Sequence, residues 1–182
     1  MTLRLEPTME ARPMSIRAAR EDDLVAINEI FNSYVDSSPC TSRTDPMSLE
    51  DRLTWFHGHT KALPVLVAIE PSGLLVGWAS LSLFRSQQTY PLVVEVSVYS
   101  RPGYARSGIG KRLVVCLCSE AARLGYRSVI AVISDANQCA VSLFQHLGFV
   151  QAGHLRELYL KHGVLYGIYY YQLSLSPLNE PA

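Results

Sequence analysis

An apolar strand, a loop rich in glycine and arginine, and a helix follow one another without interruption in the segment Val94–Val115. The first N–H groups of a helix have no partner within it and point outward, and the helix dipole adds partial positive charge there. Gly108 and Gly110 allow a ligand to approach this backbone closely. Positive charge is added nearby by Arg106, Lys111 and Arg112. The segment therefore predicts a strand-to-helix turn that binds phosphate or pyrophosphate.

Two common nucleotide-binding motifs do not fit this segment. A P-loop that ends at Gly110 and the following lysine requires Gly and Ser or Thr where the chain has Ala105 and Arg112. A dinucleotide-binding motif that starts at Gly108 requires Gly at the position of Leu113. The alternative to a ligand site is an ordinary glycine-rich entry to a helix.

The composition is that of one globular domain. The 182 residues are 48% hydrophobic and 18% charged, which provides enough apolar chain for a sizeable core. We expect a flexible lead over residues 1–13, one domain over 14–175 and a flexible tail over 176–182. The 16 basic and 16 acidic residues cancel, which argues against a broad surface for nucleic acid or for an anionic membrane.

Membrane and metal functions are not indicated. No run of about 18 apolar residues is present, so we expect no membrane-spanning helix. The charged segment 1–13 lacks the apolar core of a secretory signal. The cysteines form no Cys-x-x-Cys pair, so we interpret them as reduced thiols of a cytoplasmic protein and expect no metal site. They are Cys40, Cys116, Cys118 and Cys139.

Hydrophobic periodicity and turn residues predict the order of the elements. The expected strands are Ser15–Ala19, Pro64–Ile69, Leu74–Leu83, Leu92–Tyr99, Ser128–Ile133, Phe149–Lys161 and Leu165–Leu175. The expected helices are Glu21–Val35, Ser48–His59, Gly108–Leu124 and Asn137–Leu147. This order predicts a mixed α/β domain and not an alternating, doubly wound one.

Two segments resemble signatures of the GNAT superfamily of N-acetyltransferases. The segment Ala105–Gly110 is similar to the acyl-CoA loop, Arg/Gln-x-x-Gly-x-Gly/Ala, although its first position holds Ala. Asn137 and Ala140, followed by Leu147–Phe149, resemble the late Asn-x-x-Ala…Leu-Gly-Phe signature. The resemblance implies the GNAT fold, a single, mostly antiparallel sheet with helices on both faces and two central strands that splay apart. It also implies acetyl-CoA as the cofactor, bound in the gap between those strands.

Within the superfamily the chain most resembles the phosphinothricin N-acetyltransferases. Five residues before the loop match that group in register, namely Phe84, Arg85, Tyr90, Val94 and Glu95. Lys161–Gly163 matches its late Lys-x-Gly, whereas Gln87 and Pro91 replace two of its arginines. The resemblance implies acetyl transfer to a small amino-acid-like amine that is less acidic than phosphinothricin. It also implies a homodimer, for which the segment Tyr169–Tyr171 is either an interface or a half-buried edge strand.

The resemblance assigns residues to the acetyl-CoA site by their positions. They are Val96, Ser97, Val98, Tyr104, Ala105, Arg106, Ser107, Gly108, Ile109, Gly110, Lys111, Asn137 and Phe144. In the family the strand bulges near Val96–Val98, and its backbone N–H groups bind the thioester oxygen. The alternative for Asn137 is a helix N-cap.

Acetyl transfer requires a base that removes a proton from the attacking amine. Glu95 is a lone carboxylate in an apolar strand, where burial raises the pKa towards the working pH. The alternative is a Glu95 that pairs with Arg85. Many relatives carry a Tyr or His proton donor where this chain has Phe144. Either Tyr104 replaces that donor or the thiolate leaves without one.

Five side chains are candidates to bind the acceptor, namely Phe31, Tyr34, Phe84, Arg85 and Tyr90. The Arg85 guanidinium matches the shape of a carboxylate, and its alternative is a solvated loop arginine. The alternative for Phe31 and Tyr34 is that they are ordinary core residues, because they lie at helical spacing on one apolar face. Two rival functions stay open, namely an acyl-CoA-binding module without catalysis, which Phe144 supports, and a protein N-acetyltransferase.

Overall fold

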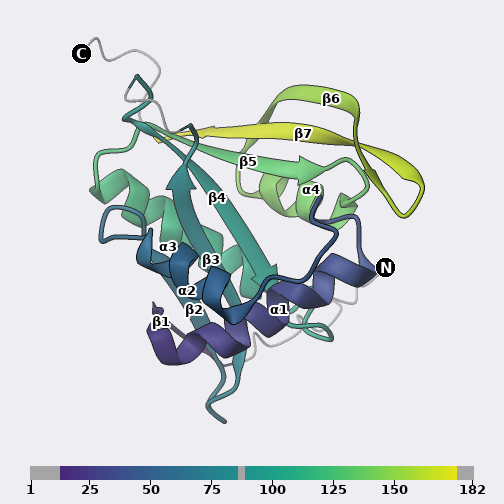
Figure 1. Cartoon of the computed structure of the whole chain (residues 1–182). Helices are drawn as coiled ribbons and strands as arrows, with labels where there is room; N and C mark the ends of the chain where they lie inside the picture. Colours follow the sequence, from purple (N-terminus) through teal and green to yellow (C-terminus); the bar gives the residue numbers. More distant parts are fainter. Residues whose placement is uncertain (1–12, 86–88, 176–182) are drawn as a thin grey trace, which may run out of the picture.

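One sheet organises the chain in the computed structural model, which describes residues 13–85 and 89–175. Seven strands in those ranges lie in the order β1-β2-β3-β4-β5-β7-β6 (Figure 1). They are β1 Ser15–Ala18, β2 Val65–Ile69, β3 Leu75–Leu83, β4 Val93–Ser100, β5 Ser128–Ser134, β6 Val150–Lys161 and β7 Val164–Ser174. Only β4 and β5 run parallel, which confirms the predicted mixed, mostly antiparallel sheet. The predicted tail and residues 1–12 of the predicted lead lie outside the described residues.

Helices pack on both faces of this sheet, as the resemblance implies. They are the short 3-10 helix Glu21–Asp23, α1 Leu24–Ser37, α2 Leu49–His57, α3 Ile109–Arg123 and α4 Gln138–His146. Buried residues of α1 share one hydrophobic cluster with β2 and β3. Buried residues of α3 and α4 share the other cluster with β3, β4 and β5. The sheet therefore separates two cores (Figure 1).

The local signals act as the sequence predicts. Ser48 caps α2, because its hydroxyl accepts the N–H of Asp51 at 3.0 Å. Gly125 follows α3 with a φ of 87°, and Gly73 turns the β2–β3 hairpin with a φ of 88°. Both angles lie in the left-handed region that glycine adopts without strain.

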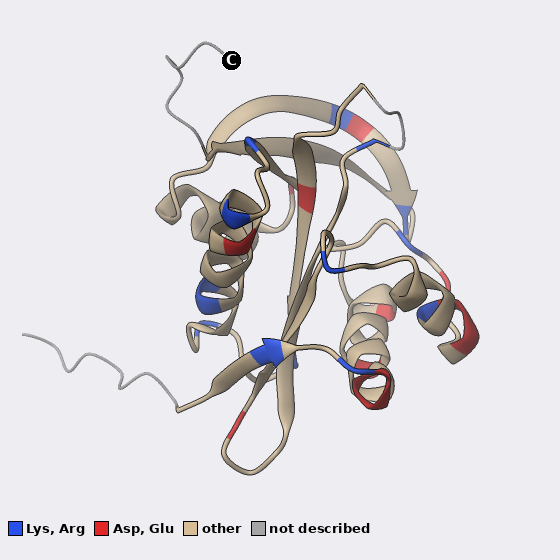
Figure 2. Cartoon of the chain, turned by 90° about the vertical axis from the view of Figure 1, so that its left-hand side faces the viewer, with Lys and Arg blue, Asp and Glu red and all other residues tan. Residues whose placement is uncertain are grey.

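Charged residues of both signs are spread over helices, loops and outer strands, with few on the central strands (Figure 2). Arg17 and Asp23 form an ion pair with an N–O distance of 2.7 Å, which ties β1 to the turn before α1. This pair lowers the pKa of Asp23, whose carboxylate also accepts the Arg20 N–H at 2.7 Å before the short 3-10 helix. None of the helices in the described ranges is long and apolar enough to cross a membrane.

The two parallel strands are paired over only part of their length. Val93–Glu95 of β4 pairs with Ser128–Ile130 of β5, and beyond these residues the strands diverge (Figure 1). On its other side β4 pairs with β3 in one unbroken register, from Gly77 opposite Ser100 to Leu83 opposite Val94. The predicted splay is confirmed. The bulge implied for Val96–Val98 is absent from the pairing of β4 with β3, whose register does not shift at these residues. The gap opens where β5 turns away from β4.

The tyrosine-rich strand β7 lies inside the sheet, between β5 and β6. Its prediction as a half-buried edge strand is therefore wrong, since the edges are β1 and β6. Tyr171 is only 1% exposed, and its hydroxyl accepts a hydrogen bond from the Gln145 side chain of α4 at 3.1 Å. Tyr171 is consequently part of the packing that joins β7 to α4, whereas the Tyr169 ring contacts His154 of β6 with ring centroids 4.2 Å apart.

Gly77 provides a direct test of how closely α3 packs on β3. A Cβ atom at this position meets Cγ2 of Ile109 at 2.6 Å and the backbone oxygen of Tyr99 at 3.0 Å. Gly77→Ala is therefore expected to lower the free energy of unfolding by about 1–3 kcal/mol through overpacking. Gly153→Ala, with nothing within 4 Å of its Cβ, should change it by less than about 0.5 kcal/mol. Equal stability of the two variants in urea unfolding contradicts this account.

Candidate active site

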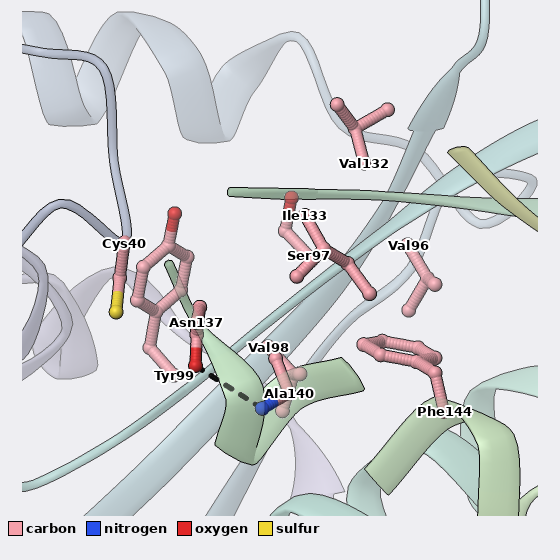
Figure 3. Close-up of a pocket in the computed structure, with 10 residues that line it drawn as sticks. All are labelled: Cys40, Val96, Ser97, Val98, Tyr99, Val132, Ile133, Asn137, Ala140 and Phe144. Atoms are coloured by element: carbon pink, nitrogen blue, oxygen red, sulfur yellow. Dashed lines mark hydrogen bonds between the residues drawn. The ribbon is translucent and has the colours of Figure 1, made fainter. Parts of the chain in front are cut away.

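A pocket lies in the gap between β4 and β5, where the two strands are no longer paired (Figure 3). Its walls come from both strands, from the first part of α4 and from the loop after α1. The lining residues are Cys40, Val96, Ser97, Val98, Tyr99, Val132, Ile133, Asn137, Ala140 and Phe144. Five of them were predicted from the sequence as cofactor-binding residues, namely Val96, Ser97, Val98, Asn137 and Phe144.

Asn137 caps a helix, which is one of the two roles predicted for it, and it also lies in the pocket wall. Its side-chain oxygen accepts the N–H of Ala140 at 3.1 Å, so it caps α4 (Figure 3). The same side chain lines the pocket. Phe144 lies about two helical turns further along α4, buried against Phe149 with ring centroids 4.9 Å apart. A phenyl ring has no proton to donate, so this wall of the pocket is apolar.

The loop between β4 and α3 has the backbone of an anion site. Gly103, Arg106 and Gly108 have φ angles of 85°, 60° and 81°, and α3 begins at Ile109. Left-handed residues that alternate with right-handed ones occur in backbone nests for anions, and Arg106 and Gly108 flank Ser107, whose own N–H donates to the Tyr104 backbone oxygen at 3.4 Å. Arg106 and Lys111 are exposed beside it. This geometry agrees with a site for phosphate at the start of α3.

The two glycines at the start of α3 have different reasons to be glycine. At Gly108 a Cβ meets nothing within 4 Å, so its backbone is open to a ligand. At Gly110 a Cβ meets Cδ2 of Leu143 at 3.2 Å, so this residue allows α3 to pack against α4. Gly110 therefore has a packing reason to be glycine, whereas ligand approach at Gly108 and Gly110 stays a prediction.

Two other predicted residues of the loop make contacts away from the pocket. The Tyr104 hydroxyl donates to a carboxylate oxygen of Glu70 at 3.2 Å, and Tyr104 is not among the lining residues. The Arg112 guanidinium donates to the backbone oxygen of Met14 at 2.9 Å and so fastens α3 to the start of β1. Neither contact directs these side chains at the gap between the strands.

Glu95 lies at the point where β4 and β5 separate, opposite Ile130 and beside Ser82 of β3. Because residues alternate along a strand, its side chain shares a face with Ser97 and Tyr99. Burial raises the pKa of the Glu95 carboxyl above its usual value. Among residues 13–85 and 89–175 it forms no ion pair.

Arg85, the predicted alternative partner of Glu95, packs instead on two aromatic rings. Its guanidinium carbon lies 5.6 Å from the ring centroid of Phe84 and 6.0 Å from that of Tyr90. The two rings contact each other edge to face at 6.4 Å. Three of the five predicted acceptor residues are thus brought together in the connection between β3 and β4.

Phe31 and Tyr34, the other two predicted acceptor residues, meet around Tyr99 of the pocket wall. Their ring centroids lie 5.4 Å and 5.6 Å from that of Tyr99, and the Trp78 ring stacks on it at 4.8 Å. The Tyr34 hydroxyl donates to the backbone oxygen of Ser100 at 2.7 Å. Burial raises the pKa of Tyr99 to about 12, so its hydroxyl keeps its proton at neutral pH.

Arg52 supports this aromatic group from inside the protein. It is 1% exposed, its guanidinium lies within 4.7 Å of the ring centroids of Phe31 and Trp55, and Nε donates to Asn28 at 3.2 Å. Burial lowers the pKa of Arg52 to about 10, so it remains charged at neutral pH. Sequence reasoning missed this residue, although an arginine three positions before Trp55 on one helical face was a signal for it.

The pocket also contains Ala140 of the late signature and four residues that sequence patterns did not identify, namely Cys40, Tyr99, Val132 and Ile133. Tyr99 had a signal, because it is the second residue after Ser97 on the face of Glu95. Cys40 had none, since it belongs to a polar loop. All four cysteines are free thiols. No group of His, Cys, Asp and Glu side chains arranged to hold a metal ion occurs in the described part of the chain.

Comparison with known proteins adds independent observations. The model of the acetyltransferase (GNAT) family matches residues 27–149. The chain is 35% identical to the L-amino acid N-acyltransferase MnaT of Escherichia coli strain K12, over 92% of this chain and 98% of that protein. It is 31% identical to an L-methionine sulfoximine/L-methionine sulfone acetyltransferase of Salmonella typhimurium, with the same two coverages. A GNAT superfamily phosphinothricin acetyltransferase from Sinorhizobium meliloti, solved with AcCoA, superposes with a TM-score of 0.86 at 31% identity over 88% of both chains.

The raised pKa of Glu95 predicts a pH-dependent cost of folding. Between the ordinary pKa of Glu and the raised value, the native state holds a proton that the unfolded chain has lost. The wild-type protein therefore loses stability as the pH rises through this window. Glu95→Gln removes that loss, so the melting temperature of the variant relative to wild type should increase between pH 4 and 8, as measured by differential scanning fluorimetry.

The exposed Glu120 provides a control of opposite sign. Arg123 lowers the pKa of Glu120, so any contribution of this pair is present at neutral pH and is lost on acidification. Glu120→Gln should consequently show no gain in relative melting temperature as the pH rises. If the melting temperatures of wild type and Glu95→Gln differ by the same amount at every pH, the assignment of a desolvated carboxylate without an ion-pair partner is contradicted.

Proposed function

The chain belongs to the GNAT family of acetyl-CoA-dependent N-acetyltransferases, and we propose that its acceptor is the amine of a small, amino-acid-like molecule. One observation carries the proposal, namely the pocket between β4 and β5 with Glu95 at the point where these strands separate. The names of the relatives support the acceptor class, since they refer to L-amino acids, methionine sulfone and phosphinothricin.

Acetyl-CoA is the acetyl donor, and two parts of the chain fit it. The segment Arg106–Gly108 and the exposed Lys111 suit the pyrophosphate, because they combine the backbone at the start of α3 with positive charge. The pocket beyond the loop combines aliphatic side chains with the polar groups of Ser97 and Asn137, and it suits the pantetheine arm, which has both methylene and amide groups. In this proposal the arm runs along Val96–Val98 and contacts Asn137 and Phe144.

In the proposed reaction the amine attacks the thioester carbonyl carbon directly. The carbon–sulfur bond breaks, an amide bond forms, and the proton of the amine passes to Glu95, directly or through one water molecule. The backbone N–H groups at Val96–Val98 bind the oxygen on which negative charge develops. A base with a raised pKa suits this step, and burial of Glu95 supports its role.

The leaving group requires no acid in this proposal. A thiol has a pKa of about 8.5, so its thiolate leaves far more readily than an alkoxide or amide. Departure as the thiolate agrees with Phe144, which cannot donate a proton and stands where many relatives have a proton donor. It also agrees with Tyr104, whose hydroxyl donates to Glu70. We therefore propose that coenzyme A leaves as the thiolate.

Arg85 with Phe84 and Tyr90 is proposed to bind the acceptor. A guanidinium that two rings hold in place presents its N–H groups to a carboxylate with little loss of entropy. Two arginines of the phosphinothricin N-acetyltransferases are replaced in this chain, one by Pro91 and the other by Gln87, which lies outside the described residues. A single cation favours an acceptor with one carboxylate over the doubly acidic phosphinothricin.

Phe144 also favours a second candidate, a protein that binds acyl-CoA without efficient transfer. We propose a reducing compartment such as the cytoplasm for either function, since the four cysteines are free. A third candidate, a protein N-acetyltransferase, is tested by the same assay with a peptide.

Acetyl-CoA turnover with a panel of acceptors tests the proposed function. The panel contains L-methionine sulfone, L-methionine sulfoximine, phosphinothricin, free L-amino acids and a peptide with a free N-terminus, and coenzyme A release is measured. We expect a sulfone or amino acid to be the best substrate, with kcat/KM at least about tenfold above that of phosphinothricin, the difference that one carboxylate–arginine contact provides. Best turnover of the peptide favours the protein acetyltransferase instead.

Glu95→Gln and the matched surface variant Glu120→Gln complete this experiment. Loss of a general base lowers kcat by about 10²–10⁴-fold and removes the acidic limb of the pH–rate profile. Glu120→Gln should retain wild-type rates. Full activity of Glu95→Gln excludes it as the base, and binding of acetyl-CoA without turnover of any amine supports the binding module.

We also propose that the enzyme is a homodimer through the outer face of the β6–β7 hairpin. Leu160 and Leu165 pair across these strands and are 62% and 54% exposed, beside the exposed Leu158. Light scattering after size exclusion should give twice the monomer mass for wild type, and Leu160→Glu should give the monomer. Val115→Glu, on the exposed side of α3, should remain dimeric. A monomeric wild-type protein contradicts this interface.

A further inference from the structure

The buried ammonium of Lys161 holds the loop that follows α1. Lys161 is the last residue of β6 and is 1% exposed. Its Nζ donates to the backbone oxygen of Ser38 at 2.8 Å and to that of Thr41 at 2.9 Å. The two carbonyl groups flank Pro39 and Cys40, so a single cation closes the loop from both ends.

Tyr159 holds the same loop two residues earlier on β6. Its hydroxyl donates to the backbone oxygen of Pro39 at 2.6 Å and lies 2.7 Å from the Ser134 hydroxyl. Ser134 is the last residue of β5. The phenol therefore joins three segments, namely β6, the end of β5 and the loop after α1. We refer to Tyr159 and Lys161 with the segment Ser38–Thr41 as the clamp.

The geometry of β6 directs the two clamp side chains to one side. The register of β6 against β7 shifts between Leu155 and Tyr159, and Glu157 has a φ of 49°. Such an irregularity bends a strand and re-aims the residues that follow it. Beyond it, the Tyr159 ring stacks on Tyr166 at 5.5 Å, which fixes the direction of its hydroxyl.

The clamp forms part of the pocket wall. Cys40 lines the pocket, and its side chain lies next to that of Tyr99 (Figure 3). Val132 and Ile133, which directly precede Ser134, line the pocket from β5. The clamp thus sets the distance between the loop after α1 and the free end of β5.

We propose that Lys161 and Tyr159 are positioning residues that set the affinity for the acceptor amine, an inference that rests on the proposed function. The loop that they hold meets the pocket at Tyr99, on the strand face that also carries Glu95. The amine must approach from this face to reach its base. The phosphate-binding loop before α3 forms no contact with the clamp among the hydrogen bonds of the described residues.

Kinetics of three variants test the clamp. Tyr159→Phe removes the hydroxyl without changing the ring, and Lys161→Met removes the ammonium group and retains an unbranched side chain of four heavy atoms. Tyr126→Phe is the matched control, because its hydroxyl also donates to a backbone oxygen, that of Ala62 at 3.0 Å. We expect the clamp variants to raise the KM of the best acceptor about five- to tenfold, the effect of one lost hydrogen bond. The KM for acetyl-CoA should rise less than that of the acceptor, because the hydrogen bonds of the clamp reach neither the loop before α3 nor Val96–Val98, and kcat should change less than about twofold.

A second readout does not depend on activity. Alkylation of Cys40 by a maleimide, followed by peptide mass spectrometry, should be about fivefold faster in Tyr159→Phe than in wild type, because the loop opens more often without this hydrogen bond. The exposed Cys116 and Cys139 serve as internal references and should react at unchanged rates. Tyr159→Phe decides the test if Lys161→Met does not fold.

The outcomes separate the two proposals. A wild-type protein that acetylates no amine contradicts the proposed function. A wild-type protein that acetylates an amine, together with a Tyr159→Phe variant whose acceptor KM is unchanged, overturns the positioning role. Equal increases in the KM of the acceptor and of acetyl-CoA overturn it as well, since they indicate a general loss of structure. An unchanged rate at Cys40 contradicts the clamp itself.

Discussion

The partial pairing of β4 with β5 is the constraint on which the rest of the structure depends. Parallel strands normally continue side by side because each backbone polar group needs a partner. Here three residue pairs are followed by divergence, so the polar edges beyond Glu95 require another partner. An extended ligand arm with its own amide groups provides such a partner. The unbroken register of β3 and β4 keeps one wall of the gap rigid, and α4 and the clamp fix the other walls.

Much of the fold was predictable because its signals are local. The strand Ser128–Ser134 differs from its predicted bounds by one residue at one end, and the helix Gln138–His146 by one residue at each end. Alternation, helical spacing and turn glycines depend on neighbours in the chain. The place of β7 was not predictable in this way, because a tyrosine-rich alternating strand has the same pattern inside a sheet as at its edge. Strand order depends on contacts between distant segments.

The residues of the candidate site also fall into those that local motifs predict and those that depend on contacts between distant segments. The residues that belong to motifs, such as Asn137 and Phe144, lie in the pocket as the resemblance implies. Cys40 and Lys161 required the structure, because 120 residues separate Lys161 from Thr41, whose backbone it binds. Even within a motif the reasons differ, since Gly108 leaves its backbone open and Gly110 allows two helices to pack. A motif therefore predicts which residues meet more reliably than it predicts what each one does.

The charged side chains inside the protein near the pocket are of two kinds, held cations and a carboxylate without an ion-pair partner among the described residues. Arg52 and Lys161 are buried cations that aromatic rings, an amide and backbone carbonyls hold in place. A buried charge costs desolvation energy, so such residues contribute more to a fixed geometry than to stability. Glu95 is the contrasting case, because no ion-pair partner among the described residues offsets its burial, and its pKa rises. Arg52 and Lys161 thus hold in place the segments around the pocket. Glu95 is the group whose raised proton affinity suits the transfer of a proton.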